Sequence, residues 1–242
     1  MRLKSLLTES INDKGIFKAL FVAGYPGSGK TTLIRKVHDG SYPVMMVNSD
    51  IWTEYYLRFD RTAWSDIGPL VRQHSLSNVY FHLNSLLPIY VDSTGSSPVL
   101  FKQRVDILKA LGYDMKMILI DVELETSKER AKRRGEMGGR KVDENYIEMA
   151  HNQINKDRGM YRSYIPDFKT VKNNEGDMTP AILNKISNEV FSFFSSPIKN
   201  DQGKKIVDFM RKKGYKYYQD IPDNEKIEQG FMLLDKSNLN WY

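Results

Sequence analysis

The sequence contains no cysteine, which excludes disulfide cross-links, thiolate metal sites, iron–sulfur clusters and a cysteine nucleophile. It also lacks a long hydrophobic run. The longest stretch without Asp, Glu, Lys or Arg, residues 73–91, is interrupted by histidine, serine, asparagine and proline, so it is not a membrane helix. The first ten residues hold two basic residues and scattered leucines instead of the apolar segment of a secretory signal. We therefore expect a soluble cytoplasmic protein with no membrane association.

Histidine is also scarce, because the chain has only four, and none has a ligand-like partner nearby in the sequence. Neither a metal cluster nor a Ser–His–Asp triad is indicated. The 242 residues are 40% hydrophobic and 27% charged, which argues against a disordered, collagen-like or coiled-coil protein. The net charge of +6 permits a polyanionic partner without requiring one.

Short apolar runs alternate with amphipathic segments along the chain. The runs that predict buried strands are 16–23, 43–47, 88–91, 115–122 and 168–171. The segments that predict helices are 31–38, 76–87, 101–111, 125–134, 143–157 and 179–194. This alternation predicts an α/β fold with a parallel sheet flanked by helices. The break at Ser195–Pro197 predicts a main domain over residues 1–196 and a small α+β unit over 197–242, with a helix at 203–213 and strands at 215–218 and 231–234.

Residues 24–31, Gly-Tyr-Pro-Gly-Ser-Gly-Lys-Thr, match the pattern G-x-x-x-x-G-K-[ST] without a mismatch, between a predicted strand and a predicted helix. Glycines let successive backbone amides point at phosphate oxygens, and the helix N-terminus adds its positive end. Lys30 should reach the β- and γ-phosphates of ATP, and the Thr31 hydroxyl should ligate Mg²⁺. The expected nucleotide-binding set is Gly24, Tyr25, Pro26, Gly27, Ser28, Gly29, Lys30, Thr31 and Thr32. The alternative is a chance glycine-rich turn.

Asp50 follows the second predicted strand, 20 residues after Lys30. The carboxyl ends of parallel strands share one edge, so Asp50 should face the phosphate loop. A carboxylate there can accept the proton of an attacking hydroxyl and orient the substrate, which is the base role in kinases. The alternative is a cap for the segment that follows, because Asp is a good N-cap residue.

The third strand is followed by Asp92-Ser93-Thr94-Gly95. Asp92 could hold Mg²⁺ through water or orient the substrate, with Thr94 as a further substrate contact. The same four residues spell D-x-x-G, which a GTPase uses to sense the γ-phosphate, so a nucleotide switch is the rival interpretation. The N-K-x-D guanine motif that should accompany it fails at 155–158 and at 184–187.

Residues 128–141 hold seven basic and two acidic residues around three glycines, so nearly all of the net charge of +6 can be placed in this one segment. A helix, a glycine hinge and a second arginine-bearing stretch are what a closing lid needs. Arginine forks would neutralise charge that develops on the transferred phosphate. Arg130 and Arg134 share a helix face, so at least one of them can point at the site. Arg134 is the first candidate for this catalytic role and Arg130 the second. Arg134 and Arg140 would also contact ATP. The alternative is a solvated basic helix face.

Together these motifs resemble the phosphate-loop kinases typified by bacteriophage polynucleotide 5′-kinase and, more distantly, the zeta toxins. The resemblance covers residues 16–172, including N-x-D at 48–50, Leu-Gly-Tyr at 111–113 and the basic segment. It implies an ATP-dependent phosphotransferase whose acceptor is a hydroxyl of a nucleic acid or nucleotide-like molecule, in the host cytoplasm if the chain is phage-encoded. The resemblance also implies that Asp50 is the base, that Asp92 supports substrate or metal, and that Arg134 stabilises the transition state. A sugar-nucleotide kinase and a non-catalytic nucleotide switch stay as alternatives.

The chain departs from these kinases at Thr53, where they carry an arginine three residues after the base. Arg58, Arg61 or Arg72 could substitute in binding the substrate. No D-x-D-x-T phosphatase motif follows. In the C-terminal unit, Tyr215, Tyr217 and Tyr218 lie among lysines and could stack on nucleic-acid bases, or they could form an ordinary aromatic strand.

Overall fold

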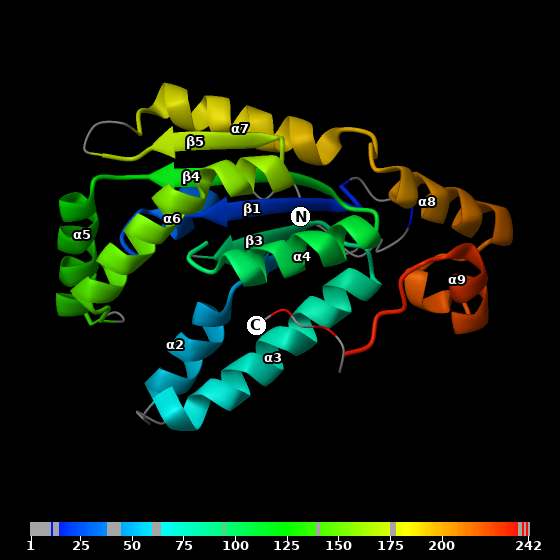
Figure 1. Ribbon diagram of the computed structural model, residues 1–242, viewed down its shortest axis with the longest axis horizontal. Coiled ribbons are helices and arrows are strands. Elements are labelled where there is room, and N and C mark those ends of the chain that lie inside the picture. Colours follow the sequence, from blue (N-terminus) through cyan, green and yellow to red (C-terminus); the bar gives the residue numbers. More distant parts are fainter. Residues whose placement is uncertain are drawn as a thin grey trace, which may run out of the picture.

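The computed structural model describes residues 11, 15–37, 45–59, 64–93, 95–138, 141–174, 178–236, 239 and 241 (Figure 1). The strands are β1 (Lys18–Ala23), β2 (Met45–Val47), β3 (Ile89–Ser93), β4 (Asp114–Asp121) and β5 (Phe168–Lys172). The helices of the main unit are α1 (Lys30–Val37), α2 (Ser49–Phe59), α3 (Trp64–Asn84), α4 (Pro98–Ala110), α5 (Leu124–Glu136), α6 (Glu144–Tyr164) and α7 (Pro180–Ser195). Two more, α8 (Asp201–Lys213) and α9 (Asp223–Gln229), follow. None of the helices in the described part of the chain has the length and apolar character needed to cross a membrane.

The strands form one parallel sheet in the order β2-β3-β1-β4-β5. Every residue of the central strand β1 is buried, as expected for a strand that is covered on both faces. Ala23, its last residue, lies beside Ser93 of β3 and Leu119 of β4, so the three strands end near one edge. Ligands bind at this edge in open parallel sheets. The predicted parallel sheet with flanking helices is confirmed.

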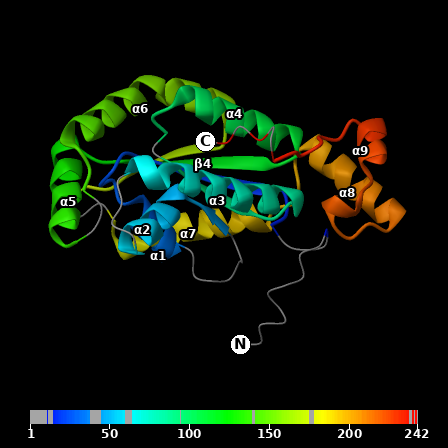
Figure 2. The same cartoon turned by 90° about the horizontal axis from the view of Figure 1, so that it is seen from below.

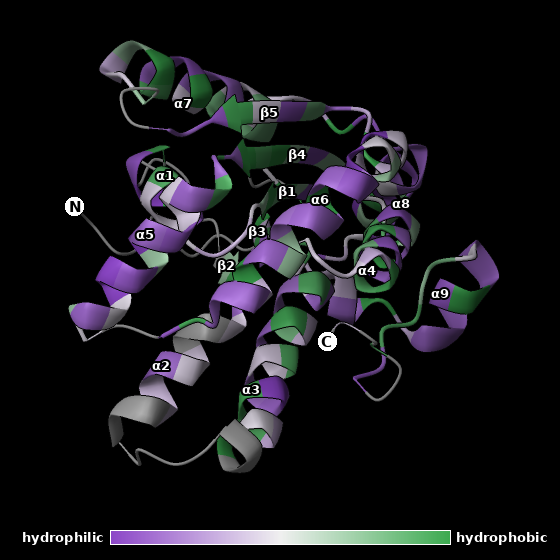
Figure 3. Ribbon diagram, turned by 60° about the vertical axis from the view of Figure 1, so that its left-hand side comes forward, coloured by the Kyte–Doolittle hydropathy of each residue, from purple (hydrophilic) through white to green (hydrophobic). Residues whose placement is uncertain are grey.

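Side chains of β1 alternate between two apolar clusters, one on each face of the sheet. Phe21 belongs to the cluster that includes residues of α3, α4, α6 and α8, and Leu20 belongs to the cluster that includes α1 and α7. Figure 2 shows α4 and α6 on one side of the sheet and α7 with α1 on the other. Figure 3 shows the apolar strands in green between helices whose outer faces are polar. Successive side chains of a strand point to opposite faces of the sheet, so a strand that is covered on both faces needs apolar side chains on both.

A buried ion pair joins the sheet to the connection between α7 and α8. Lys18 of β1 and Asp114 of β4 lie 2.5 Å apart, and their side chains are 1% and 10% exposed. The Lys18 ammonium also donates to Ser196 Oγ at 3.1 Å and to the Pro197 carbonyl at 3.0 Å. The Asp114 carboxylate accepts bonds from two backbone amides of the connection, those of residues 199 and 200, at 2.8 Å each. Each charge therefore has the partners that burial requires.

The C-terminal unit is helical, and the two strands predicted for it are wrong. Residues 215–217 have no strand conformation, Tyr218–Asp220 form a short 3₁₀ helix, and residues 231–234 are irregular. Gly214 and Gly230 adopt left-handed conformations (φ +78° and +67°) that end α8 and α9. The aromatic spacing that suggested strands arises because Tyr218 and Phe231 pack into one core, where the Tyr218 hydroxyl donates to the Met232 carbonyl at 2.7 Å.

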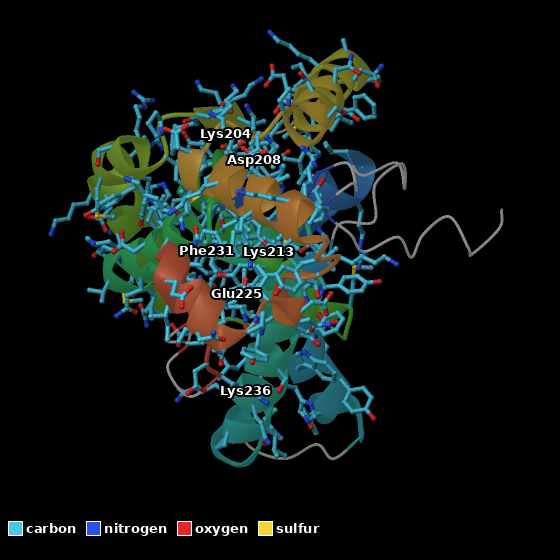
Figure 4. All side chains as sticks on the ribbon, turned by 90° about the vertical axis from the view of Figure 1, so that its right-hand side faces the viewer. Lys204, Asp208, Lys213, Glu225, Phe231 and Lys236 are labelled. Carbon is cyan, nitrogen blue, oxygen red and sulfur yellow. The ribbon has the colours of Figure 1, made fainter. Side chains whose placement is uncertain are left out.

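Helix α8 packs closely on the main unit. A Cβ on Gly112, in the turn after α4, would lie 2.5 Å from the Cα of Gly203, so both positions need glycine. Ile206 and Met210 join the same apolar cluster as α4. Figure 4 labels Lys213 of α8 beside Glu225 of α9, and these two side chains form an ion pair at 3.2 Å. The boundary between two domains at residue 196 stays a prediction.

Candidate active site

A cavity of about 740 Å³ opens at the carboxyl edge of the sheet. It is lined by the phosphate loop, by the ends of β2 and β3, and by residues of α1, α2, α4, α5 and α6. The basic side chains on its wall are Lys30, Arg35, Arg104, Arg130 and Arg134, and the acidic ones are Glu54 and Asp92. The positive excess favours a polyanionic ligand such as a triphosphate.

The phosphate loop spans residues 24–29 between β1 and α1. Gly27 and Gly29 have left-handed backbones (φ +84° and +92°), a conformation that other residues rarely adopt. A Cβ on Gly27 would collide with the backbone of Ser127, and one on Gly29 would collide with the side-chain amide of Asn173. Both glycines are thus needed to keep this loop closely packed against α5 and the end of β5.

Lys30 begins α1, and its ammonium donates to the carbonyl of Gly24 and, at 3.4 Å, to that of Tyr25. Six residues of the predicted nucleotide-binding set line the cavity: Pro26, Gly27, Gly29, Lys30, Thr31 and Thr32. Gly24, Tyr25 and Ser28 do not line it. The Thr31 side chain is exposed on the cavity wall, where its hydroxyl can bind a ligand.

Tyr25 has a structural role. Its hydroxyl donates to the Val122 carbonyl and accepts the Val122 amide at 2.9 Å, and it lies 3.4 Å from a carboxylate oxygen of Asp121. Burial raises the pKa of Tyr25 to about 12, so the hydroxyl stays protonated at neutral pH. The side chain ties the loop to the end of β4 and leaves phosphate binding to the loop backbone.

Asn173, directly after β5, was not predicted from the sequence. Its side-chain amide donates to the Ser28 carbonyl at 2.6 Å, and its own carbonyl accepts from Arg130 at 2.7 Å. Its backbone amide donates to the Asp121 carbonyl at 2.8 Å. One residue thus connects the phosphate loop to helix α5. A polar Lys-Asn-Asn sequence at the end of the last strand was the available signal, since that strand ends at the same edge.

Asp92, at the end of β3, lines the cavity, and its carboxylate accepts a bond from the Asn48 side chain at 2.9 Å. The Asn48–Asp92 bond connects the ends of β2 and β3. The Tyr161 hydroxyl donates to the Gly95 carbonyl and fixes the loop after β3, and burial raises the pKa of Tyr161. Thr94 lies outside the described residues.

Asp50 is the second residue of α2, which places its backbone next to the cavity residue Ser49. Because the helix begins one residue earlier, at Ser49, an N-cap role would fall to the residue before the helix rather than to Asp50. Asp50 thus lies in the first turn of α2 at the carboxyl edge of the sheet. The catalytic role assigned to it stays a prediction.

The basic segment begins on α5, which continues two residues beyond the predicted end at Arg134. Arg130 and Arg134 both line the cavity, as their shared helix face predicts. Gly138 follows the helix in a left-handed conformation with open space around it. Arg140 lies outside the described residues.

This chain has threonine at position 53, where the resembling kinases carry an arginine. Of the three arginines suggested to replace it, the one whose side chain is described does not line the cavity. Thr53 is buried, and its hydroxyl donates to the Ser49 carbonyl at 3.1 Å. Arg72 is exposed on α3 and does not line the cavity. The Arg58 side chain and Arg61 lie outside the described residues. Two cavity arginines, Arg35 and Arg104, were missed instead.

The oxygen groups at the cavity are of the kind that Mg²⁺ accepts. Thr31 offers a hydroxyl and Asp92 a carboxylate, and Mg²⁺ typically takes one or two such ligands together with phosphate oxygens and water. Within the described residues, no group of three or more His, Asp or Glu side chains is arranged to hold a metal by itself. The donor set therefore fits a nucleotide-bound Mg²⁺.

Solved structures of other proteins share this fold. A protein of Chloroflexus aurantiacus described as a candidate kinase is 17% identical, with a TM-score of 0.53, and the match covers 73% of this chain and 97% of that one. A chain of the Pnkp1/Rnl/Hen1 RNA repair complex is 22% identical, with a TM-score of 0.51, and the match covers 62% and 47%. A chain of the PezAT toxin–antitoxin system of Streptococcus pneumoniae is 16% identical, with a TM-score of 0.52, and the match covers 87% and 92%.

A comparison with curated proteins finds no significant match. The family AAA_33, described as an AAA domain, matches residues 20–155, which is more than half of the chain and includes the phosphate loop, Asp92 and both cavity arginines of α5. The fold is that of the phosphate-loop kinases. The chain belongs to the AAA_33 family.

Proposed function

We propose that the protein is an ATP-dependent kinase that transfers the γ-phosphate of ATP to a hydroxyl of a nucleic acid or nucleotide-like acceptor. The observation that carries this proposal is the single cavity that holds the phosphate loop, Asp92 and the two arginines of α5. These are the parts that phosphoryl transfer needs, because catalysis of this reaction is mostly positioning and charge neutralisation.

The loop backbone and Lys30 would bind the β- and γ-phosphates. Thr31 and Asp92, the latter through water, would hold Mg²⁺, which when bound neutralises charge on the phosphate oxygens. Arg134 and Arg130 would neutralise the charge that develops during transfer. Arg130 donates to the Asn173 carbonyl, and the Asn173 side chain donates to the Ser28 carbonyl, so α5 is connected to the phosphate loop through Asn173.

Asp50 is the proposed general base. It would accept the proton of the acceptor hydroxyl as that oxygen bonds to the γ-phosphorus, while the bond from the γ-phosphorus to the bridging oxygen breaks and ADP leaves. This assignment is supported by the place of Asp50 in the first turn of α2, after the strand end that carries Asn48. The N-x-D pattern at 48–50 in the resembling kinases supports it as well.

The test is an acceptor screen with γ-labelled ATP. The acceptors are a 5′-hydroxyl oligonucleotide, a hydroxymethylated DNA and UDP-N-acetylglucosamine, each with the unsubstituted protein and with Lys30→Ala. We expect label in a nucleic-acid acceptor and none with Lys30→Ala. Label in the sugar nucleotide alone would make the protein a sugar-nucleotide kinase instead. Strong GTP selectivity without transfer would make it a nucleotide switch.

A further inference from the structure

Trp241, which follows the last helix α9, contributes to the wall of the cavity. Figures 1 and 2 show the red segment that follows α9 running back toward α4, away from the end of the sheet where α8 and α9 lie. Trp241 lines the cavity, although it follows a unit attached at the opposite end of the strands. Its indole is only 1% exposed, so it is packed firmly against the main unit.

Trp241 holds Arg104 of α4 through two contacts. Arg104 Nε donates to the Trp241 carbonyl at 3.0 Å, and the guanidinium carbon lies 5.7 Å from the centre of the Trp241 ring. The hydrogen bond and the cation–π contact restrain a side chain that otherwise has many rotamers. An arginine that is already restrained loses less entropy when it binds an anion, so its affinity for that anion is higher.

Arg104 and the arginines of α5 enter the cavity from different sides. In the sheet, β3 and β4 lie on opposite sides of β1, the strand that leads into the phosphate loop. Helix α4 follows β3, whereas α5 follows β4. Arg130 and Arg134 therefore approach the loop from the β4 side, and Arg104 belongs to the β3 side. Among the described residues, Arg104 is the basic side chain that α4 contributes to the cavity.

The β3 side is where an acceptor would bind under the proposed function. Asp92 ends β3, and the carboxylate accepts from Asn48 at the end of the neighbouring β2. With the triphosphate held by the loop and by α5, the acceptor hydroxyl has to approach from the side of β2 and β3. A cation at that side is placed to bind charge on the acceptor and not on ATP.

We propose that Arg104 is the acceptor-specificity residue of this cavity, that it binds a phosphate group carried by the acceptor, and that Trp241 is its positioning residue. This proposal rests on the proposed kinase function. It makes Trp241 a support for the acceptor site. The buried indole acts through Arg104 and does not serve as a stacking surface, because almost none of it is accessible.

The first test is a binding measurement that does not require catalysis. The phosphate loop of the full-length protein is saturated with Mg²⁺ and a non-hydrolysable ATP analogue, and adenosine 3′-monophosphate and UDP-N-acetylglucosamine are titrated by calorimetry. Adenosine and N-acetylglucosamine are the uncharged controls. Arg104→Gln should weaken binding of a phosphate-bearing probe about tenfold or more, which is the usual effect of losing a hydrogen bond to a charged group. Binding of the uncharged probes should not change.

Three further variants separate charge from structure. Lys109→Gln, on the exposed face of the same helix, removes one positive charge and should leave binding unchanged. Trp241→Leu removes the ring contact but keeps the backbone carbonyl that accepts from Arg104, so it should weaken binding of the phosphate-bearing probe less than Arg104→Gln does. Trp241→Phe retains an aromatic ring under the guanidinium and should restore most of the affinity. In the transfer assay, Arg104→Gln and Trp241→Leu should raise the KM of the acceptor while the KM of ATP stays constant.

The proposal would be overturned by no binding of either phosphate-bearing probe, or by equal binding by Arg104→Gln and the unsubstituted protein. Equal losses for charged and uncharged probes would also overturn it, because they would indicate a structural role only. Failure of the proposed function is distinguishable from these outcomes. In that case, Arg104-dependent binding of the phosphate-bearing probe would be present, but no label would be transferred to any acceptor.

Discussion

The buried pair of Lys18 and Asp114 makes an asymmetric prediction about stability. Asp114→Ala leaves the ammonium of Lys18 in a site that is 1% exposed, where the Ser196 hydroxyl, the Pro197 carbonyl and the Phe193 ring remain as uncharged partners. Lys18→Met removes that charge and leaves the Asp114 carboxylate bonded to two backbone amides. The loss of the acid should therefore destabilise the protein more than the loss of the base.

The magnitudes follow from these partners. Removing one member of a buried ion pair costs about 3–5 kcal/mol, because an uncompensated charge remains. Asp114→Ala should lower the free energy of unfolding by that amount. In Lys18→Met the remaining carboxylate keeps its donors, and the lost hydrogen bonds cost about 1–2 kcal/mol. The exposed pair of Lys102 and Asp106, whose side chains are 51% and 53% exposed, provides the control, and Asp106→Ala should cost less than about 1 kcal/mol.

The assay is equilibrium unfolding in urea, followed by far-UV circular dichroism for the unsubstituted protein and each variant. The double variant Lys18→Met/Asp114→Ala should be more stable than Asp114→Ala, because it no longer buries an unpaired charge. If Asp114→Ala costs no more than Lys18→Met, or if the double variant is the least stable, this interpretation of the pair is wrong.

Three further predictions concern the packing of α8, the phosphate loop and Tyr25. Gly112→Ala should destabilise the protein or displace α8, because its Cβ would lie 2.5 Å from the Gly203 Cα, and limited proteolysis of the C-terminal unit should detect this. Asn173→Ala removes the bond to the Ser28 carbonyl and should weaken binding of a fluorescent ATP analogue about two- to tenfold; unchanged affinity would show that the loop needs no such support. Tyr25 has a pKa raised from 10.0 to about 12, so its contribution to stability is complete below pH 10 and is lost as the pH rises toward 12. The melting temperature of Tyr25→Phe should accordingly fall less between pH 9.5 and pH 11.5 than that of the unsubstituted protein, and equal losses would contradict the role of this hydroxyl.

Local patterns were sufficient to predict the elements that surround the loop. The strands β1 to β4 each contain a short apolar run bounded by glycine, proline or a polar residue, whereas β5 is only partly apolar. These signals depend on neighbouring residues only. Helix α3 begins at Trp64, well before the predicted stripe at 76–87. The first part of the helix was missed because Pro69 lies inside it, and proline normally signals a break. The strands predicted near Tyr218 failed because aromatic residues can be buried equally well from turns.

The parts of the site that were missed depend on contacts between distant segments. Asn173 acts on Ser28, 145 residues earlier, and Trp241 acts on Arg104, 137 residues earlier. No local spacing reports which of many polar residues will meet after folding. Arg72 shows the converse, because an arginine close in sequence to the predicted base lies on an exposed face of α3.

The proposed kinase reaction is tested most directly by the transfer rate of Asp50→Asn. The assay measures the single-turnover rate of label transfer from ATP to the acceptor found in the screen, with binding of a fluorescent ATP analogue measured in parallel. Asp208→Asn, an exposed substitution on α8, is the matched control. We expect Asp50→Asn to lower the rate about a hundredfold or more with ATP binding unchanged, since general-base catalysis contributes that much. An Asp50→Asn protein as fast as the control would contradict the proposed mechanism.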